Sequence, residues 1–152
     1  MKVKQIENKD EKERISRLIL ESLNKWFEIE ESREMYIRQS VDKVFFGAFD
    51  EDKAVGFLYL KPTGKDTVEL AVMGVLEEYH RNGVGRILFE NAEKAAKNAG
   101  FSFIQVKTVK MGTYDDYDKT NKFYQVVGFK EFEVFPELWD EQNPCQIYVK
   151  SL

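Results

Sequence analysis

Residues 68–88 read VELAVMGVLEEYHRNGVGRIL, and the fold that the sequence predicts is built outward from them. The first part of this stretch is apolar and rich in β-branched residues, which predicts a buried strand over residues 67–75. Gly83 and Gly85 follow, and from Val84 onward the apolar residues recur on one face of a helix. The stretch therefore predicts a strand, a turn that contains glycines, and an amphipathic helix.

The start of this helix has the properties of an anion-binding site. The first N–H groups of a helix have no partner within it, and the helix dipole adds a partial positive charge. Glycine has no Cβ, so a ligand can approach the backbone of Gly83 and Gly85 closely. We therefore expect a phosphate group here, or else a turn whose glycines serve only the fold. Arg86 excludes a P-loop, and Leu88 excludes the third glycine of a dinucleotide-binding turn.

The composition limits the classes of protein to consider. The chain has 152 residues, of which 43% are hydrophobic, and this suits one folded domain over residues 1–152. The net charge of -4 argues against a nucleic-acid partner. Cys145 is the only cysteine, and no apolar run is long enough for a membrane span or a signal peptide, so we expect a cytoplasmic protein with no membrane partner. No cluster has the spacing of metal ligands, and we expect no metal.

The rest of the chain predicts alternating strands and helices. The predicted strands are residues 2–6, 44–49, 54–60, 67–75, 103–109, 129–135 and 145–150. The predicted helices follow Asn8, cover residues 28–41, begin at the glycine turn, and cover residues 116–127. Residues 136–144 are expected to be irregular.

Two short motifs carry a resemblance to a known family. Residues 80–85, HRNGVG, resemble the Gln/Arg-x-x-Gly-x-Gly/Ala motif of the GNAT superfamily of N-acetyltransferases, with His80 in place of Gln or Arg. Residues 123–129, FYQVVGF, are similar to the Tyr-x-x-x-Gly-Phe element of the same enzymes. The order of the predicted elements also matches, so the resemblance covers essentially the whole chain. It implies an α/β (α+β) fold with a mixed, mostly antiparallel sheet of about seven strands flanked by four helices.

The resemblance also implies a function. The expected activity is acetyl-CoA-dependent N-acetyl transfer, directly from the thioester to a primary amine of a small molecule, protein or peptide. The alternative is a non-catalytic module that binds an acyl-CoA or acts through a partner. Tyr124 and the glycine turn favour the enzyme, because neither is needed merely to fold. Acyl donors other than acetyl-CoA stay open.

The catalytic candidates follow from the same resemblance. Tyr124 matches the tyrosine beside the thioester sulfur, and a phenol with a pKa of about 10 can protonate a leaving thiolate. Its other interpretation is a core aromatic residue. Glu69, four residues before Met73, has the spacing of the general base in the histone-acetylating branch, or is an ordinary exposed strand residue. Gly74 suits either a β-bulge that frees a backbone N–H for the oxyanion or a close packing contact.

The cofactor contacts are expected from the glycine turn and the end of the preceding strand. Asn121 is added because many family members have an asparagine seven residues before Tyr124, where this chain has Tyr117. The expected contacts are Met73, Gly74, Val75, His80, Arg81, Asn82, Gly83, Val84, Gly85, Arg86 and Asn121.

The acceptor is less specified by the sequence. Acidic residues are frequent in the loops that border the acceptor cleft of the family, namely Asp115, Asp116, Asp118, Asp140 and Glu141. They suit a cationic amine, and solvated acidic loops are the alternative. Residues 135–140, FPELWD, could line the acceptor pocket or form a homodimer contact.

Overall fold

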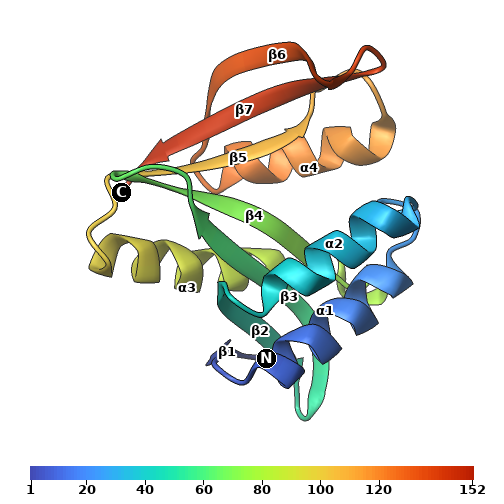
Figure 1. Ribbon diagram of the computed structural model, residues 1–152, viewed down its shortest axis with the longest axis vertical. Coiled ribbons are helices and arrows are strands. Elements are labelled where there is room, and N and C mark those ends of the chain that lie inside the picture. The colour runs from blue at the N-terminus through green and yellow to red at the C-terminus, as the bar shows by residue number, and fades with distance from the viewer. The chain divides into compact units, whose positions relative to one another are not determined.

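A computed structural model describes residues 1–152 (Figure 1) and confirms the predicted order of elements. The elements are β1 (Lys2–Ile6), α1 (Lys9–Ser22), α2 (Glu30–Ser40), β2 (Val44–Asp50), β3 (Lys53–Pro62), β4 (Thr67–Val75), the short 3₁₀ helix η1 (Glu77–Tyr79), α3 (Val84–Asn98), β5 (Phe103–Val109), α4 (Asp115–Val126), β6 (Lys130–Asp140) and β7 (Asn143–Ser151). None of the helices is both long and apolar enough to cross a membrane.

The seven strands form one sheet in the order β1-β2-β3-β4-β5-β7-β6. The pairs β1–β2, β2–β3, β5–β7 and β6–β7 are antiparallel, whereas β4 and β5 run parallel. The parallel register joins residues 67–69 of β4 to residues 103–105 of β5. The predicted mixed, mostly antiparallel sheet with four α-helices is therefore confirmed.

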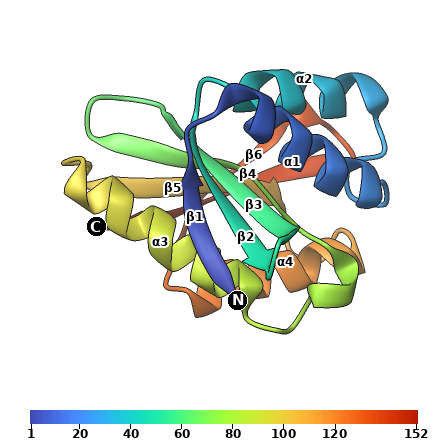
Figure 2. The same cartoon turned by 90° about the horizontal axis from the view of Figure 1, so that it is seen from below.

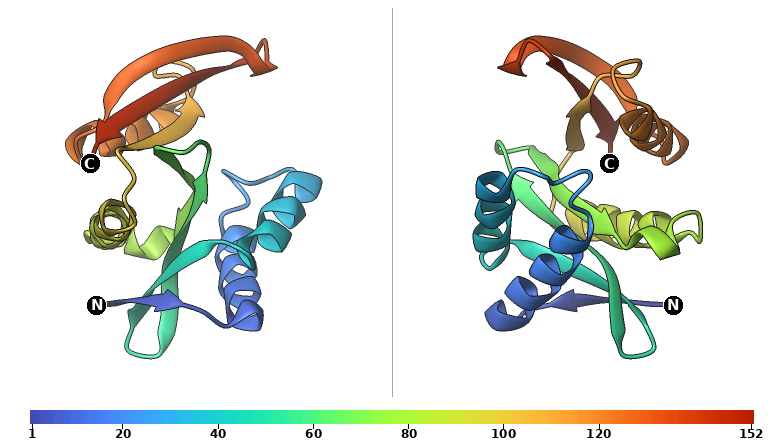
Figure 3. Two further views of the ribbon diagram at one scale, coloured as in Figure 1. Left: turned by 60° about the vertical axis from the view of Figure 1, so that its left-hand side comes forward. Right: turned by 90° about the vertical axis from the view of Figure 1, so that its right-hand side faces the viewer.

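The chain divides into two compact units, which we describe separately. The first unit contains Met1–Lys61 and Leu70–Ala95, and the second contains Pro62–Glu69 and Ala96–Leu152. In the first unit, α1 and α2 lie side by side (Figure 2) on one face of the strands, and α3 covers the opposite face (Figure 3). The strands between them carry a stacked aromatic core, in which the ring centroids of Phe45 and Phe57 are 5.3 Å apart.

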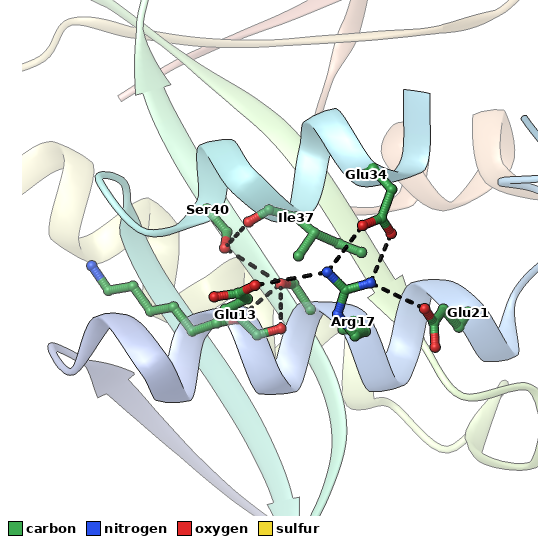
Figure 4. A network of polar contacts seen from close by, with 8 residues as sticks. Glu13, Arg17, Glu21, Glu34, Ile37 and Ser40 are labelled. Carbon is green, nitrogen blue, oxygen red and sulfur yellow. Dashed lines mark hydrogen bonds and ion pairs between the residues drawn. The ribbon is translucent and has the colours of Figure 1, made fainter. Parts of the chain in front are cut away.

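Helices α1 and α2 are joined by polar contacts as well as by packing. Asn8 caps α1, as its spacing to Glu11 predicts, because its Oδ1 accepts the Glu11 N–H at 2.9 Å. The Arg17 guanidinium donates to both carboxylate oxygens of Glu34 at 2.7 and 3.0 Å and to Glu21 at 3.2 Å (Figure 4). We call Arg17 and Glu34 the helix clasp. Beneath it, the hydroxyl groups of Ser16 and Ser40 are 3.3 Å apart.

In the second unit, α4 packs on β5 and β7. The side chains at this contact are polar and are described with the site below. Strands β6 and β7 form a hairpin whose turn is held by Asp140, which accepts the N–H of Gln142 at 2.9 Å and the amide of Asn143 at 2.8 Å.

The prediction that residues 136–144 are irregular is wrong, since β6 and β7 continue through most of them. Pro136 misled the prediction, because proline has no N–H to donate to a sheet. It is tolerated here because β6 is the edge strand of the sheet and its register with β7 shifts between Phe135 and Asp140.

Candidate functional site

The glycine turn, residues 80–85, ends in the first turn of α3. The N–H of Ile87 bonds to the carbonyl of Gly83 at 3.1 Å and is the first to close a helical bond. The N–H groups of Val84, Gly85 and Arg86 come before it and are the donors that a helix start leaves without intrahelical partners. The turn therefore has the backbone arrangement that the sequence predicts for an anion site.

Two residues of the turn have backbone angles that ordinary side chains avoid. Arg81 has a φ of 68° and Gly83 has a φ of 78°. A left-handed conformation costs a residue with a side chain on the order of 1–2 kcal/mol, which the glycine avoids. A Cβ added at Gly83 would meet no atom within 4 Å, so the glycine is needed for its backbone angle and leaves open space beside it. Strain of this kind is common where a protein holds a ligand.

His80 links the turn to the end of β4. Its Nε2 lies 2.7 Å from the carbonyl oxygen of Val75. A carbonyl can only accept, so Nε2 carries the hydrogen and donates. The edge of the imidazole also packs against Trp26, with ring centroids 5.6 Å apart. These contacts give His80 a part in holding the turn.

The residues at the end of β4 alternate between the two faces of the sheet. Burial alternates without interruption from Thr67 to Val75, with Glu69 and Met73 on the half-buried face. Gly74 lies on the opposite, buried face. A Cβ added there would come within 3.0 Å of Ile19 and 3.1 Å of Leu23. Gly74 therefore serves the close packing of α1, which was one of its two interpretations.

Tyr124 occupies an unusual environment in the second unit. Its side chain is 6% exposed and its ring packs against Phe129 and Tyr148, with centroids 5.6 and 6.2 Å away. Its hydroxyl makes no hydrogen bond within the protein, yet the only fully enclosed side-chain nitrogen or oxygen without a partner is Arg33 Nε. The Tyr124 hydroxyl is thus unpaired and still reachable. Burial raises the pKa of Tyr124 above its ordinary value of 10.0, so the phenol stays protonated at neutral pH.

Asn121 lies one turn before Tyr124 on α4 and is fully buried. Its Nδ2 donates to the carbonyl of Val109 at 2.8 Å and to that of Tyr117 at 2.7 Å. Its Oδ1 accepts the hydroxyl of Tyr148 at 2.6 Å. The predicted contact of Asn121 with a cofactor would require some of these bonds to break.

Glu69 forms an ion pair that the sequence analysis did not anticipate. Its Oε1 lies 3.1 Å from Nζ of Lys107, and the two side chains are 12% and 30% exposed. Glu69 is opposite Gln105 in the parallel register, and Gln105 and Lys107 share a face of β5. A lysine in the middle of the apolar strand FIQVKTV was the available signal, because such a charge needs a partner.

Two of the predicted acidic residues have a local use in the second unit. Asp118 accepts the N–H of Gly112 at 2.7 Å, and Asp140 holds the β6–β7 turn. Asp115, Asp116 and Asp118 lie in the first turn of α4, where negative charge is favourable.

Cys145 is fully buried, and this burial raises the pKa of its thiol. A protonated, enclosed thiol is not suited to nucleophilic attack.

Comparisons with known proteins agree with the fold. The model of the Acetyltransferase (GNAT) family matches residues 12–129. An uncharacterized N-acetyltransferase of Chlorobaculum tepidum is 27% identical over 118 residues, which cover 72% of this chain and 70% of that protein.

Solved structures are similar over the whole chain. The aminoglycoside 6'-N-acetyltransferase complexed with coenzyme A has a TM-score of 0.80 at 20% identity, covering 99% of this chain and 97% of its own. The PaiA N-acetyltransferase of Thermoplasma acidophilum in complex with coenzyme A has a TM-score of 0.72 at 22% identity, with both chains covered completely, at 100% each. These likenesses show the same fold, and the family model covers well over half of the sequence. The chain therefore belongs to the GNAT family of acetyltransferases.

Proposed function

We propose that this protein is an acetyl-CoA-dependent N-acetyltransferase that moves the acetyl group directly to a primary amine. The observation that carries the proposal is the hydroxyl of Tyr124, which is unpaired and protonated in an otherwise buried side chain. A core tyrosine usually finds a partner for its hydroxyl. A hydroxyl kept without one, at the position of the family's catalytic tyrosine, supports a role as proton donor.

The glycine turn fits the phosphate groups of coenzyme A. The three N–H groups that precede the first helical bond of α3 can donate to phosphate oxygens, and the space beside Gly83 lets a ligand approach. Two relatives of the same fold are described as complexes with coenzyme A, which supports this cofactor. When bound, acetyl-CoA supplies a thioester, whose carbonyl carbon is the acetyl donor.

The proposed reaction needs one acid and one base from the chain. As the amine nitrogen bonds to the acetyl carbon, the carbon–sulfur bond breaks and Tyr124 gives its O–H proton to the sulfur. The amine loses a proton to Glu69, directly or through water. Lys107 holds the carboxylate of Glu69 in place through a contact of 3.1 Å. Glu69 then releases its proton to solvent, and a proton from solvent restores Tyr124.

Calorimetric titration with acetyl-CoA tests the binding half of the proposal. We expect saturable binding that weakens when Gly85 is replaced by leucine, with dephospho-CoA and longer acyl-CoA esters as controls. Absence of binding to every acyl-CoA would contradict the proposal and leave the turn a purely structural role.

An amine panel read by release of CoA tests the catalytic half. The acidic first turn of α4 supports including polyamines and lysine peptides beside neutral amines. Binding of acetyl-CoA without CoA release on any amine would favour the alternative, a non-catalytic module that binds an acyl-CoA.

A further inference from the structure

We propose that Tyr148 and Asn121 are positioning residues that fix the hydroxyl of Tyr124 for proton transfer. This inference rests on the proposed function and adds residues of β7 and α4 to it. We call Asn121, Gln125 and Tyr148 the α4 clamp.

The α4 clamp is a continuous chain of hydrogen bonds, of which the two made by Asn121 are buried and the one made by Gln125 is partly buried. The hydroxyl of Tyr148 donates to Oδ1 of Asn121 at 2.6 Å and accepts from Nε2 of Gln125 at 3.2 Å. Asn121 in turn donates to the carbonyl of Val109, the last residue of β5, at 2.8 Å. One helical turn of α4 is thereby attached to β7 by two bonds and to β5 by a third.

The clamp lies beside Tyr124 on the helix. Tyr124 and Gln125 follow Asn121 by three and four residues, so each is a neighbour of Asn121 on the surface of α4. The ring of Tyr148 also packs against that of Tyr124, with centroids 6.2 Å apart. Rotation of α4 about its axis would have to break the clamp, and the same rotation would displace the Tyr124 hydroxyl.

A polar clamp provides something that apolar packing would not. Asn121 and Tyr148 both have 0% exposure, and burying polar groups is costly unless every bond is made. Hydrogen bonds have fixed lengths and directions, so a satisfied network specifies one orientation of the helix. Tyr124 makes no hydrogen bond of its own, so its hydroxyl depends on its neighbours for its position. A displacement of about 1 Å at a reacting group can cost about 100-fold in rate.

The test compares Tyr148→Phe in two backgrounds. The substitution keeps the ring and removes only the hydroxyl. In the wild-type background we expect kcat to fall about ten-fold with little change in the KM for acetyl-CoA. In the Tyr124→Phe background we expect no further fall, because a displaced phenylalanine has no proton to donate.

Gln125→Met, at an exposed position, removes one clamp bond with less risk to folding and should lower kcat by about two- to three-fold.

Tyr59→Phe is the matched control. Tyr59 is also a buried tyrosine, 1% exposed, and its hydroxyl donates to the carbonyl of Tyr36 at 2.9 Å. Tyr148→Phe and Tyr59→Phe should each lower the melting temperature by about 2–4 °C, but Tyr59→Phe should leave kcat unchanged.

The outcomes separate the two proposals. The positioning role would be overturned if Tyr148→Phe left kcat unchanged, or if it lowered kcat equally in the wild-type and Tyr124→Phe backgrounds. Either result would leave the proposed acetyltransferase function intact. A wild-type protein that releases no CoA with any amine would overturn the proposed function and the positioning role together.

Discussion

At Tyr124 the sequence motif and the side-chain environment support the same role. Replacing Tyr124 with phenylalanine removes only the hydroxyl, which bonds to nothing in the protein. We expect kcat to fall about 100-fold or more, since a positioned acid contributes about 100- to 10,000-fold. The dissociation constant for acetyl-CoA should stay within about two-fold. Steady-state kinetics and calorimetry measure both, with Tyr114→Phe, an exposed tyrosine, as control.

The raised pKa of Tyr124 also predicts the direction in which the stability of the protein changes with pH. The folded protein holds the phenolic proton more tightly than the unfolded chain does. The resulting stabilisation is complete below the ordinary pKa of 10.0 and is lost as the pH rises through the folded value. Above about pH 10 the wild type should therefore lose stability relative to Tyr124→Phe, and below that pH the difference between the two should stay constant.

Gly83 and Gly100 form a natural pair for testing the turn. Both have positive φ values, 78° and 93°, and an added Cβ would meet no atom within 4 Å at either. Gly83→Ala and Gly100→Ala should each cost about 1–2 kcal/mol of unfolding free energy. Only Gly83→Ala should also weaken acetyl-CoA binding, by about ten-fold, because it lies in the phosphate turn. If the two variants bound acetyl-CoA equally well, the phosphate groups would not bind at this turn.

The proposed role of Glu69 as the general base can be tested directly. If Glu69 is the base, Glu69→Gln should lower kcat/KM by about 100-fold at neutral pH and remove the acidic limb of the pH–rate profile. Lys107→Gln is the control, because it breaks the same ion pair but leaves a carboxylate able to accept a proton. A Glu69→Gln profile that matched wild type would exclude Glu69 as the base.

Residues of the site differ in how far the sequence could reveal them. Tyr124 and Gly83 lie in local motifs, whose chemistry depends on a few consecutive positions. Lys107 pairs with Glu69 of a neighbouring strand and Tyr148 with Asn121 of α4, and these partners are 38 and 27 residues away. Such pairs depend on how distant elements pack, which a single sequence does not specify.

At the scale of elements, the helix clasp shows how α1 and α2 are held. Hydrogen bonding from Arg17 lowers the pKa of Glu34 below its ordinary value of 4.5. A carboxylate with a lowered pKa contributes stability above its unfolded pKa and loses it as the pH falls through the folded value. We expect Glu34→Gln to lower the melting temperature slightly at pH 7. The difference should shrink as the pH falls below 4.5, the ordinary pKa of the carboxyl group, and it should shrink in 1 M salt because the pair is partly exposed.

Most helices and strands could be predicted because each has its own hydrophobic periodicity or ends at a residue, such as glycine, that terminates it. Strand β4 and helix α3 have clear periods, and Gly100 and Gly128 end helices with φ values of 93° and 107°. The β6–β7 hairpin was missed because its strand carries Pro136 and its turn depends on the side chain of Asp140. An edge strand tolerates a proline, but the sequence does not say which strand is at the edge.

For the whole molecule, two sequence motifs together with the order of strands and helices predicted the family. The sheet order β4-β5-β7-β6 departs from chain order, and no local pattern in the sequence contains it. The resemblance, which two motifs separated by a helix and a strand made specific, predicted the mixed, mostly antiparallel sheet without this order. The acceptor amine could not be predicted in the same way, because acidic residues such as Asp118 and Asp140 have local structural uses that look identical in the sequence.

The single cysteine is placed so that its labelling by a thiol reagent would measure local unfolding of the protein. Cys145 lies in β7 between Val109 of β5 and Phe135 of β6, and it is fully buried. A thiol reagent can reach it only when the structure that covers its side chain opens. We expect labelling to be slow in native protein and to accelerate in mild denaturant. It should slow again with saturating acetyl-CoA, the ligand that we propose for the folded state. With one thiol per chain, mass spectrometry would read each labelled molecule as one opening event, without an introduced probe.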